Sequence, residues 1–140
     1  MVSLKYLLDT DALSEPMKPR PHAGFLRRLE AHRDRVAIAS TTWHEALFGM
    51  CRLPAGRRRQ DIEEFLTRVV APSIPILAYD ARAAEWHAEE RARLLARGRA
   101  VSFTDGQIAA IAKQNDLAVV TRNAKDFSHF DDLEVEDWWR

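Results

Sequence analysis

Short apolar runs alternate with longer segments of helical spacing along this chain, and this alternation limits the fold more than any other feature. The apolar runs predict strands at residues 4–8, 35–39, 74–77, 118–121 and 133–135. Apolar residues at helical spacing predict helices at 11–17, 22–32, 56–70 and 105–114. Strands separated by helices form a mostly parallel sheet that is covered on both faces. The sequence therefore predicts an α/β fold: a three-layer α/β/α domain with a mostly parallel central sheet.

Residues typical of helix ends and strand edges refine this outline. Asp80 and Gly98 are a favourable N-cap and C-terminal glycine for one long helix between them. The segments Thr42–Glu45 and Thr104–Gln107 have the spacing of a capping box, which predicts that helices begin there. Pro75 lacks a backbone donor and marks residues 74–77 as an edge strand.

The bulk composition excludes several classes of protein. The 140 residues suffice for a single domain with a substantial core, and we assign residues 1–140 to it. The net charge is zero, which argues against a protein that coats nucleic acid indiscriminately. No apolar run is long enough for a membrane span. Cys51 is the single cysteine, so an internal disulfide is excluded and a reducing cytoplasm is expected.

Four acidic residues follow the predicted strands or begin the predicted helices: Asp9, Glu45, Asp105 and Asp126. In a parallel sheet, functional sites form outside the carboxyl ends of the strands, so the fold would gather these side chains. Gathered carboxylates repel one another and favour a cation among them. Any one of these acids is more often a helix cap or a solvated side chain. The four together predict a site for a hard metal ion, Mg²⁺ or Mn²⁺.

The same four acids predict a hydrolytic mechanism. Mg²⁺ commonly takes one or two carboxylates and keeps several waters, so Asp9 and Asp105 are expected as primary ligands. Glu45 and Asp126 would complete the shell through water or bind a second ion. The hypothesis is in-line attack of metal-activated water on a phosphodiester. His44, beside Glu45, is more often structural than catalytic.

Arginines gather in two places. One group lies at residues 91–99, and the other comprises Arg57, Arg58 and Arg59. Such groups are either solvated helix faces or local patches that hold a nucleic-acid backbone, and the residues leave both readings open.

Four segments, in order along the chain, resemble the motifs of PIN-domain nucleases, in particular the VapC-type toxins of type II toxin–antitoxin modules. They are Tyr6-Leu7-Leu8-Asp9-Thr10-Asp11, Ser40–Gly49 with Glu45, Asp105-Gly106-Gln107-Ile108-Ala109-Ala110, and Thr121–Phe127. Glu136-Asp137-Trp138 also resembles a common ending of these proteins. The resemblance implies a PIN-like α/β/α fold over the whole chain.

Two positions depart from the family pattern. Asp11 stands where the family usually has Asn, which adds a negative charge near Asp9 and suggests an outer-shell role. The fourth acid of the family occurs at the position of Asn123 in some members and at that of Asp126 in others. Because Asn123 is neutral here, Asp126 is expected to be the fourth carboxylate, with Asn123 supplying a carbonyl oxygen or orienting a water.

The resemblance also implies an activity and partners. The activity would be an Mg²⁺-dependent endoribonuclease that cleaves structured RNA, with Thr10 and Thr42 in the outer shell and Arg122 in contact with a phosphate. A VapB-type antitoxin would cover the acids and would be the DNA-binding component, and the chain would form a homodimer. Candidate antitoxin grooves are the stripe of Phe25, Leu26 and Leu29 and the face of Trp43 and Leu47, both of which could equally be core.

Two alternatives from other classes remain open at the level of sequence. One is a different metal-dependent phosphoesterase, a DNA nuclease or a phosphatase, on the same acidic site. The other is a catalytically inert PIN-fold module that binds a partner or RNA without turnover.

Overall fold

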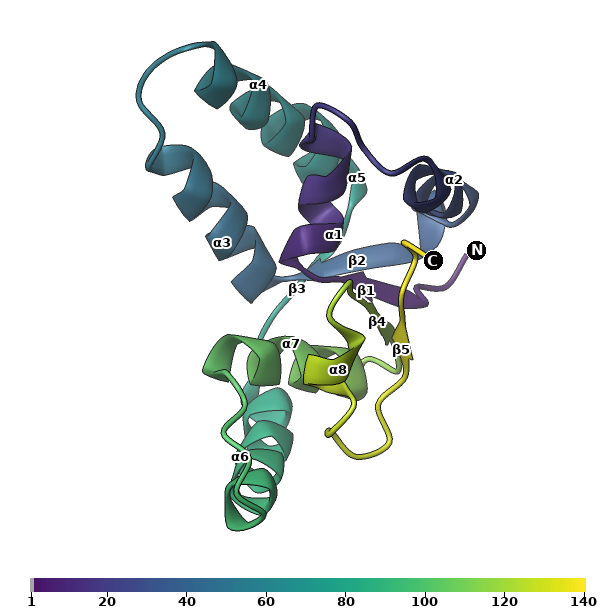
Figure 1. Cartoon of the computed structure of the whole chain (residues 1–140), viewed down its shortest axis with the longest axis vertical. Helices are drawn as coiled ribbons and strands as arrows, with labels where there is room; N and C mark the ends of the chain where they lie inside the picture. The colour runs from purple at the N-terminus through teal and green to yellow at the C-terminus, as the bar shows by residue number, and fades with distance from the viewer. Residues whose placement is uncertain (1) are drawn as a thin grey trace.

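The computed structural model describes residues 2–140 and contains a five-stranded parallel sheet at its centre (Figure 1). The strand order is β3-β2-β1-β4-β5, and every described pair is parallel. The strands are β1 (Tyr6–Leu8), β2 (Val36–Ala39), β3 (Ile76–Leu77), β4 (Ala118–Val120) and β5 (Val135–Glu136). The predicted strands are therefore confirmed: the first four have shorter bounds, and the last is shifted from 133–135 to Val135–Glu136. The edge position of the two-residue β3 agrees with the prediction from Pro75.

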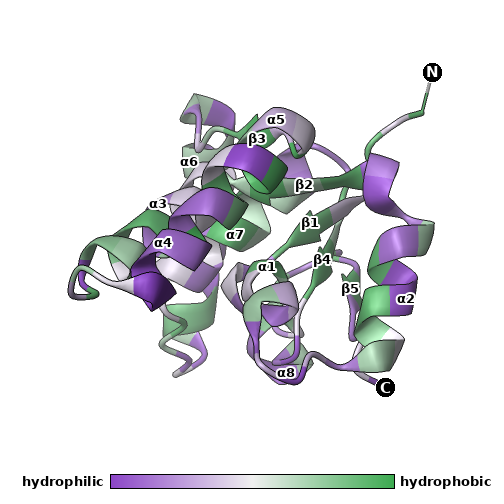
Figure 2. Ribbon diagram, turned by 90° about the horizontal axis from the view of Figure 1, so that it is seen from above, coloured by the Kyte–Doolittle hydropathy of each residue, from purple (hydrophilic) through white to green (hydrophobic). Residues whose placement is uncertain are grey.

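Helices cover both faces of this sheet. They are α1 (Thr10–Ser14), α2 (Ala23–Ala31), α3 (Ser40–Cys51), α4 (Arg57–Glu64), α5 (Ala71–Ser73), α6 (Ala81–Ala96), α7 (Phe103–Gln114) and α8 (Ala124–Phe127). Short 3₁₀ turns follow α1 at Glu15–Met17 and precede β2 at Arg33–Arg35. Helices α6 and α7 pack together on one face, while α1 and α2 lie on the other (Figures 1 and 2). The three-layer α/β/α prediction is confirmed.

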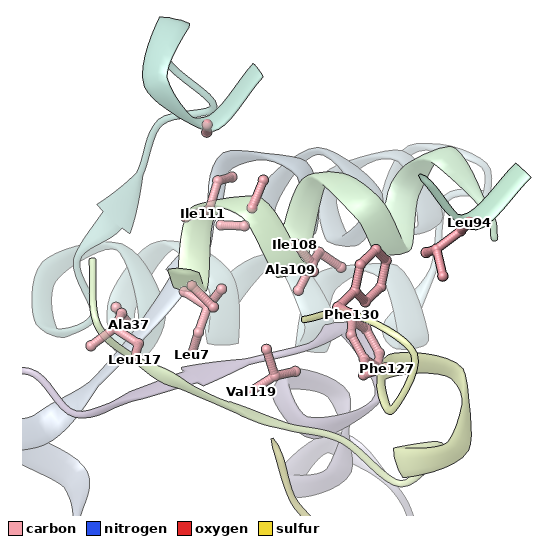
Figure 3. Packing of buried hydrophobic residues seen from close by; sticks show 14 residues of the cluster. Leu7, Ala37, Leu94, Ile108, Ala109, Ile111, Leu117, Val119, Phe127 and Phe130 are labelled. Carbon is pink, nitrogen blue, oxygen red and sulfur yellow. The ribbon is translucent and has the colours of Figure 1, made fainter. Parts of the chain in front are cut away.

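Two apolar clusters lie on opposite faces of the sheet, because successive strand residues point in opposite directions. Leu7, Ala37 and Val119 pack with buried residues of α7 such as Ile108 and Ile111 (Figure 3). On the other face the buried strand residues Tyr6, Leu8, Val36, Ile38, Ala118 and Val120 pack with α1, α2 and the two C-terminal tryptophans. Because both faces are covered, strands β1, β2 and β4 are apolar throughout.

The parallel register brings the carboxyl ends of neighbouring strands together at one end of the sheet. Leu8 of β1 lies opposite Ile38 of β2 and Val120 of β4. Asp9 directly follows β1, and its N–H donates to the Val120 carbonyl at 3.1 Å. Residues that follow β1, β2 and β4 therefore meet at the carboxyl end of the sheet, where the sequence analysis predicts the candidate site.

Two helix starts differ from the prediction. Helix α3 begins at Ser40, immediately after β2, and no side chain caps it. Thr42 is fully buried within its first turn, so its hydroxyl is not placed as a cap. Helix α7 begins at Phe103, because Ser102 Oγ accepts the Asp105 N–H at 3.0 Å and acts as the N-cap. The predictions of capping boxes at Thr42 and Thr104 were therefore wrong.

The segment predicted as one helix over 56–70 changes geometry along its length. After α4, residues Phe65–Val70 form a π-helical stretch that leads into α5. The Ala71 N–H donates to the Leu66 carbonyl, five residues back. Pro72 follows and has no N–H to donate to the preceding turn. Regular α-helical hydrogen bonding therefore cannot continue through this segment.

The long helix was predicted correctly. Asp80 Oδ1 accepts the Ala83 N–H at 2.9 Å, and α6 ends before Gly98, which has φ +75°. Within residues 2–140 no helix combines the length and the apolar character that a membrane crossing needs.

Candidate active site

Asp9 lies at the carboxyl end of β1, where it caps helix α1. Its Oδ1 accepts the Ala12 N–H at 2.9 Å, and the side chain is almost fully buried. Burial raises the pKa of Asp9 to about 6, while hydrogen bonds from Thr121 and Ala12 oppose the rise and the charges of Asp11 and Asp105 add to it. A cap with a raised pKa is unusual, because capping alone lowers the pKa of a carboxylate.

Thr121 is a site residue that sequence reasoning missed. It directly follows β4, is fully buried and hydrogen-bonds the Asp9 carboxylate. Its Oγ1 also accepts the Asn123 N–H at 3.0 Å. The available signal was its position, since β4 is the parallel neighbour of β1 and residues after the two strands must meet.

Asp105 lies in the first turn of α7, on the side of the sheet covered by α6. Burial raises the pKa of Asp105; the hydrogen bond with Ser102 opposes this rise, and the charges of Asp126 and Asp11 strengthen it. The charge of Asp11 contributes to the raised pKa of both Asp9 and Asp105. The fold therefore gathers Asp9, Asp11, Asp105 and Asp126 into one electrostatically coupled group.

Asp126 belongs to this group through its position on α8. It is exposed and lines a pocket of about 380 Å³ together with Asp105. Asn123 precedes α8, is exposed and makes no capping hydrogen bond through its side chain. Asp126 therefore lines the same pocket as Asp105, whereas Asn123 meets the site through its backbone N–H on Thr121.

Glu45 lies apart from the coupled acids. It is exposed on α3 and lines a second pocket, also of about 380 Å³, with Thr10. This groove runs between α1, α3 and α4 and is otherwise mostly apolar, with Ala46, Met50, Leu53, Ile62, Phe65 and Leu66 among its lining residues. Glu45 therefore lines an apolar groove and not the pocket that holds Asp105 and Asp126.

Comparison with known proteins identifies the fold family. Residues 6–133 match the PIN domain family. This chain belongs to the PIN domain family. It is 34% identical to the tRNA(fMet)-specific endonuclease VapC of Shigella flexneri, covering 96% of this chain and 98% of the relative. It is 30% identical to toxin FitB of Neisseria gonorrhoeae, covering 94% and 97%.

Solved structures agree with this assignment. The FitAcB structure from Neisseria gonorrhoeae superposes on this PIN domain with a TM-score of 0.88 at 31% identity, covering 96% of this chain and 99% of that one. VapBC-5 of Mycobacterium tuberculosis, a member of the VapBC family of toxin–antitoxin systems, superposes with a TM-score of 0.65 at 25% identity, covering 97% of each chain.

The donor set of this PIN domain suits a hard cation. Among residues 2–140, no three His, Cys, Asp or Glu side chains lie close enough to form a ready-made metal cage. Mg²⁺ does not need such a cage, because it is commonly held by one or two carboxylates and several waters. Asp9 and Asp105 are carboxylates whose ionisation is disfavoured by burial and by neighbouring acids, and a divalent cation would reverse both effects.

Thr42, predicted in the outer shell, and Arg122, predicted to contact a phosphate, occupy different surroundings. Thr42 Oγ1 is buried and has no hydrogen-bond partner in the part of the chain that the structure describes, at the start of the helix that follows β2. A buried hydroxyl without a partner is costly, so it suits a site that admits water. The Arg122 guanidinium lies over the Trp139 ring, 5.7 Å from its centroid, and its predicted contact with a phosphate stays a prediction.

Proposed function

We propose that this PIN domain is the toxin of a type II toxin–antitoxin module and acts as an Mg²⁺-dependent endoribonuclease on structured RNA. The observation that carries the proposal is the coupled acidic group, in which burial and mutual repulsion raise the pKa of both Asp9 and Asp105. Relatives named as an endonuclease and as a toxin match nearly the whole chain and support the same activity.

The residues have distinct roles in this proposal. Asp9 and Asp105 would hold the cation, with Asp126 and Glu45 reaching it through water or holding a second ion. Bound Mg²⁺ or Mn²⁺ would lower the pKa of a coordinated water and stabilise negative charge on the phosphate that is cleaved. The Ala12 N–H and Thr121 fix the Asp9 carboxylate, so little reorganisation is needed when the cation binds.

A VapB-type antitoxin is the proposed partner, and the groove beside Glu45 is its proposed seat. The groove combines an apolar floor with an acidic residue of the site, so a peptide lying along it would cover Glu45. Of the stripe formed by Phe25, Leu26 and Leu29, Phe25 is core, because it is fully buried against Trp138 and Trp139, whereas Leu26 and Leu29 are only partly buried. Leu47 and Trp43 are partly buried on α3, the helix that forms one wall of the groove.

Three further expectations follow from the same assignment. Contact with DNA would be made through the antitoxin. The homodimer stays a prediction, which light scattering on the purified chain would test. The proposed location is the cytoplasm, where the RNA substrate is found.

The proposed function is tested by inducing this chain alone in a bacterial host. We expect growth arrest with the parent chain and none with Asp9→Asn or Asp105→Asn at matched expression, because each variant removes one carboxylate from the site. Purified parent protein should cleave RNA in Mg²⁺ and lose this activity in EDTA. The proposal fails if the parent is inert on RNA, or if both variants cleave RNA as fast as the parent.

A further inference from the structure

The pocket that holds Asp105 and Asp126 has a basic half that the proposed hydrolysis does not use. Its lining also includes Arg99, from the segment after α6, and His129, from the segment after α8. Arg99 Nη1 donates to His129 Nε2 at 3.0 Å. Because a guanidinium has five N–H donors, most of the donors of Arg99 stay free for an anion. Acids and donors for an anion thus line the same pocket.

The segment carrying His129 is anchored to α6. The His129 carbonyl accepts Arg93 Nη2 at 2.8 Å, and the Asp131 N–H donates to Glu90 Oε1 at 2.6 Å. Glu90 in turn binds Arg93 through two hydrogen bonds. The backbone that carries His129 is therefore fixed by a buried carboxylate and its arginine partner, which places the His129 side chain at the pocket.

The arginines around this pocket differ in their partners. Arg93 is paired with Glu90, whereas Arg91 and Arg99 form no salt bridge anywhere in residues 2–140. Cations without acidic partners beside a pocket attract phosphate groups, and guanidinium matches phosphate geometry particularly well.

Phe103 adds an aromatic surface next to this charge. It is the first residue of α7, and 50% of it is exposed. Its ring packs 4.8 Å from the His87 ring, and the Arg91 guanidinium lies 5.3 Å from its centroid. Phe103 also directly follows Ser102, which lines the pocket. An anchored, half-exposed ring beside free guanidinium groups is the combination on which nucleic-acid bases stack.

We infer that this surface is an RNA-binding subsite next to the cleavage site, in which Arg99 and His129 bind a backbone phosphate and Phe103 stacks an unpaired base. The inference rests on the proposed function, because it places the subsite beside the acids that would cleave the RNA. A protein partner is less well matched, since an apolar segment on Phe103 would leave the guanidinium groups of Arg91 and Arg99 without an anionic partner. The subsite would favour RNA whose bases are unstacked near the cleaved bond.

The test is RNA binding measured in EDTA, which separates binding from cleavage. The probe is a fluorescein-labelled single-stranded RNA, followed by fluorescence anisotropy at several salt concentrations. Arg99→Ala should weaken binding roughly tenfold and reduce the salt-dependence slope by about 0.7. Phe103→Ala should weaken it roughly 5- to 100-fold. Arg99→Lys keeps the charge and should recover part of the loss.

Two controls make the result specific. Arg27→Ala removes an exposed arginine from α2, on the opposite layer, and should leave binding unchanged. On an abasic version of the probe, Phe103→Ala should bind like the parent while Arg99→Ala is still weakened, because only the stacking contact is missing. Thermal melting checks that each variant is folded.

The inference is overturned if folded Arg99→Ala and Phe103→Ala bind RNA as tightly as the parent, in which case this surface belongs to a protein partner. It is also overturned if Arg27→Ala weakens binding equally, since the effect is then one of general charge. If the predicted losses appear but added Mg²⁺ produces no cleavage, the subsite stands and the proposed ribonuclease activity fails.

Discussion

At the scale of single residues, Asp9 shows how one carboxylate can serve both the fold and the site. Its Oδ1 caps α1 through the Ala12 N–H, yet its pKa is raised to about 6. Capping favours the charged form, so the raised value means that burial and the neighbouring acids outweigh the cap. In the metal-free protein, ionisation of Asp9 therefore opposes folding.

This balance predicts that Asp9→Asn stabilises the metal-free protein at neutral pH. The folded pKa lies above the ordinary value of 3.8, so stability is greatest below about pH 4 and falls as the pH rises towards about 6. A shift of this size corresponds to about 3 kcal/mol. Asparagine keeps a cap oxygen but does not ionise, so this part of the pH dependence should vanish.

Urea unfolding of both proteins in EDTA, at several pH values between about 4 and 7, measures the effect. The difference in free energy of unfolding should grow with pH in favour of the variant. A difference that is constant with pH would mean that Asp9 ionises normally in the folded protein.

Gly106 is a second residue with a clear structural role, because one neighbouring side chain leaves no room for a Cβ at this position. A Cβ at Gly106 would collide with the ring of His87, which is buried and hydrogen-bonded through Nδ1 to the Tyr79 hydroxyl at 2.8 Å. The ring cannot move away without breaking that bond. Because Gly106 follows Asp105, the contact also sets how closely the first turn of α7 approaches α6.

Gly106→Ala should therefore destabilise the protein by roughly 1–3 kcal/mol through overpacking. In a His87→Ala background the same change should be neutral, or stabilising by up to about 1 kcal/mol, because alanine favours the helix. Thermal unfolding of the parent, the two single variants and the double variant provides the cycle. Equal effects of Gly106→Ala in both backgrounds would contradict the role of His87.

At the scale of elements, a buried glutamate ties the C-terminus to the segment after α1. Glu15 accepts hydrogen bonds from Trp139 Nε1 at 2.7 Å, Lys18 Nζ at 2.9 Å and the His22 N–H at 3.1 Å. Burial alone would raise the pKa of Glu15, but these three donors outweigh it and lower the pKa to about 2. The C-terminal tryptophans thereby cover one face of the sheet.

Glu15→Gln should remove this attachment and cost roughly 2–4 kcal/mol at neutral pH. Since the folded pKa is below the ordinary value of 4.5, the contribution is complete above about pH 5 and is lost as the pH falls towards about 2. Acid unfolding followed by tryptophan fluorescence should show a smaller pH dependence in the variant. An unchanged acid transition would mean that other carboxylates control it.

At the scale of the whole molecule, the site is an assembly of four separate segments. Asp9 follows β1 as the N-cap of α1, Asp105 and Asp126 lie on α7 and α8, and Glu45 lies on α3. A ligand that binds this assembly stabilises the entire fold, because the unfolded chain does not hold the segments together.

Saturating Mg²⁺ should therefore raise the melting temperature of the parent by several degrees. Asp105→Asn should lose most of this increase. The matched control is Asp116→Asn, because Asp116 is exposed just before β4, at the opposite edge of the sheet, and asparagine tolerates its φ of +54°. An equal increase in all three proteins would place cation binding elsewhere.

The sequence by itself determined the order of strands and helices along the chain and the choice of the four candidate acids, because these depend on local apolar periodicity and on residue type. Tertiary structure alone decided which partners each side chain meets. Thr121 reaches Asp9 only through the pairing of β4 with β1, and Arg99 reaches His129 only because α6 anchors the segment after α8. The helix starts at Ser40 and Phe103 were missed for the same reason: burial of Thr42 and capping by Ser102 depend on contacts that local spacing does not encode.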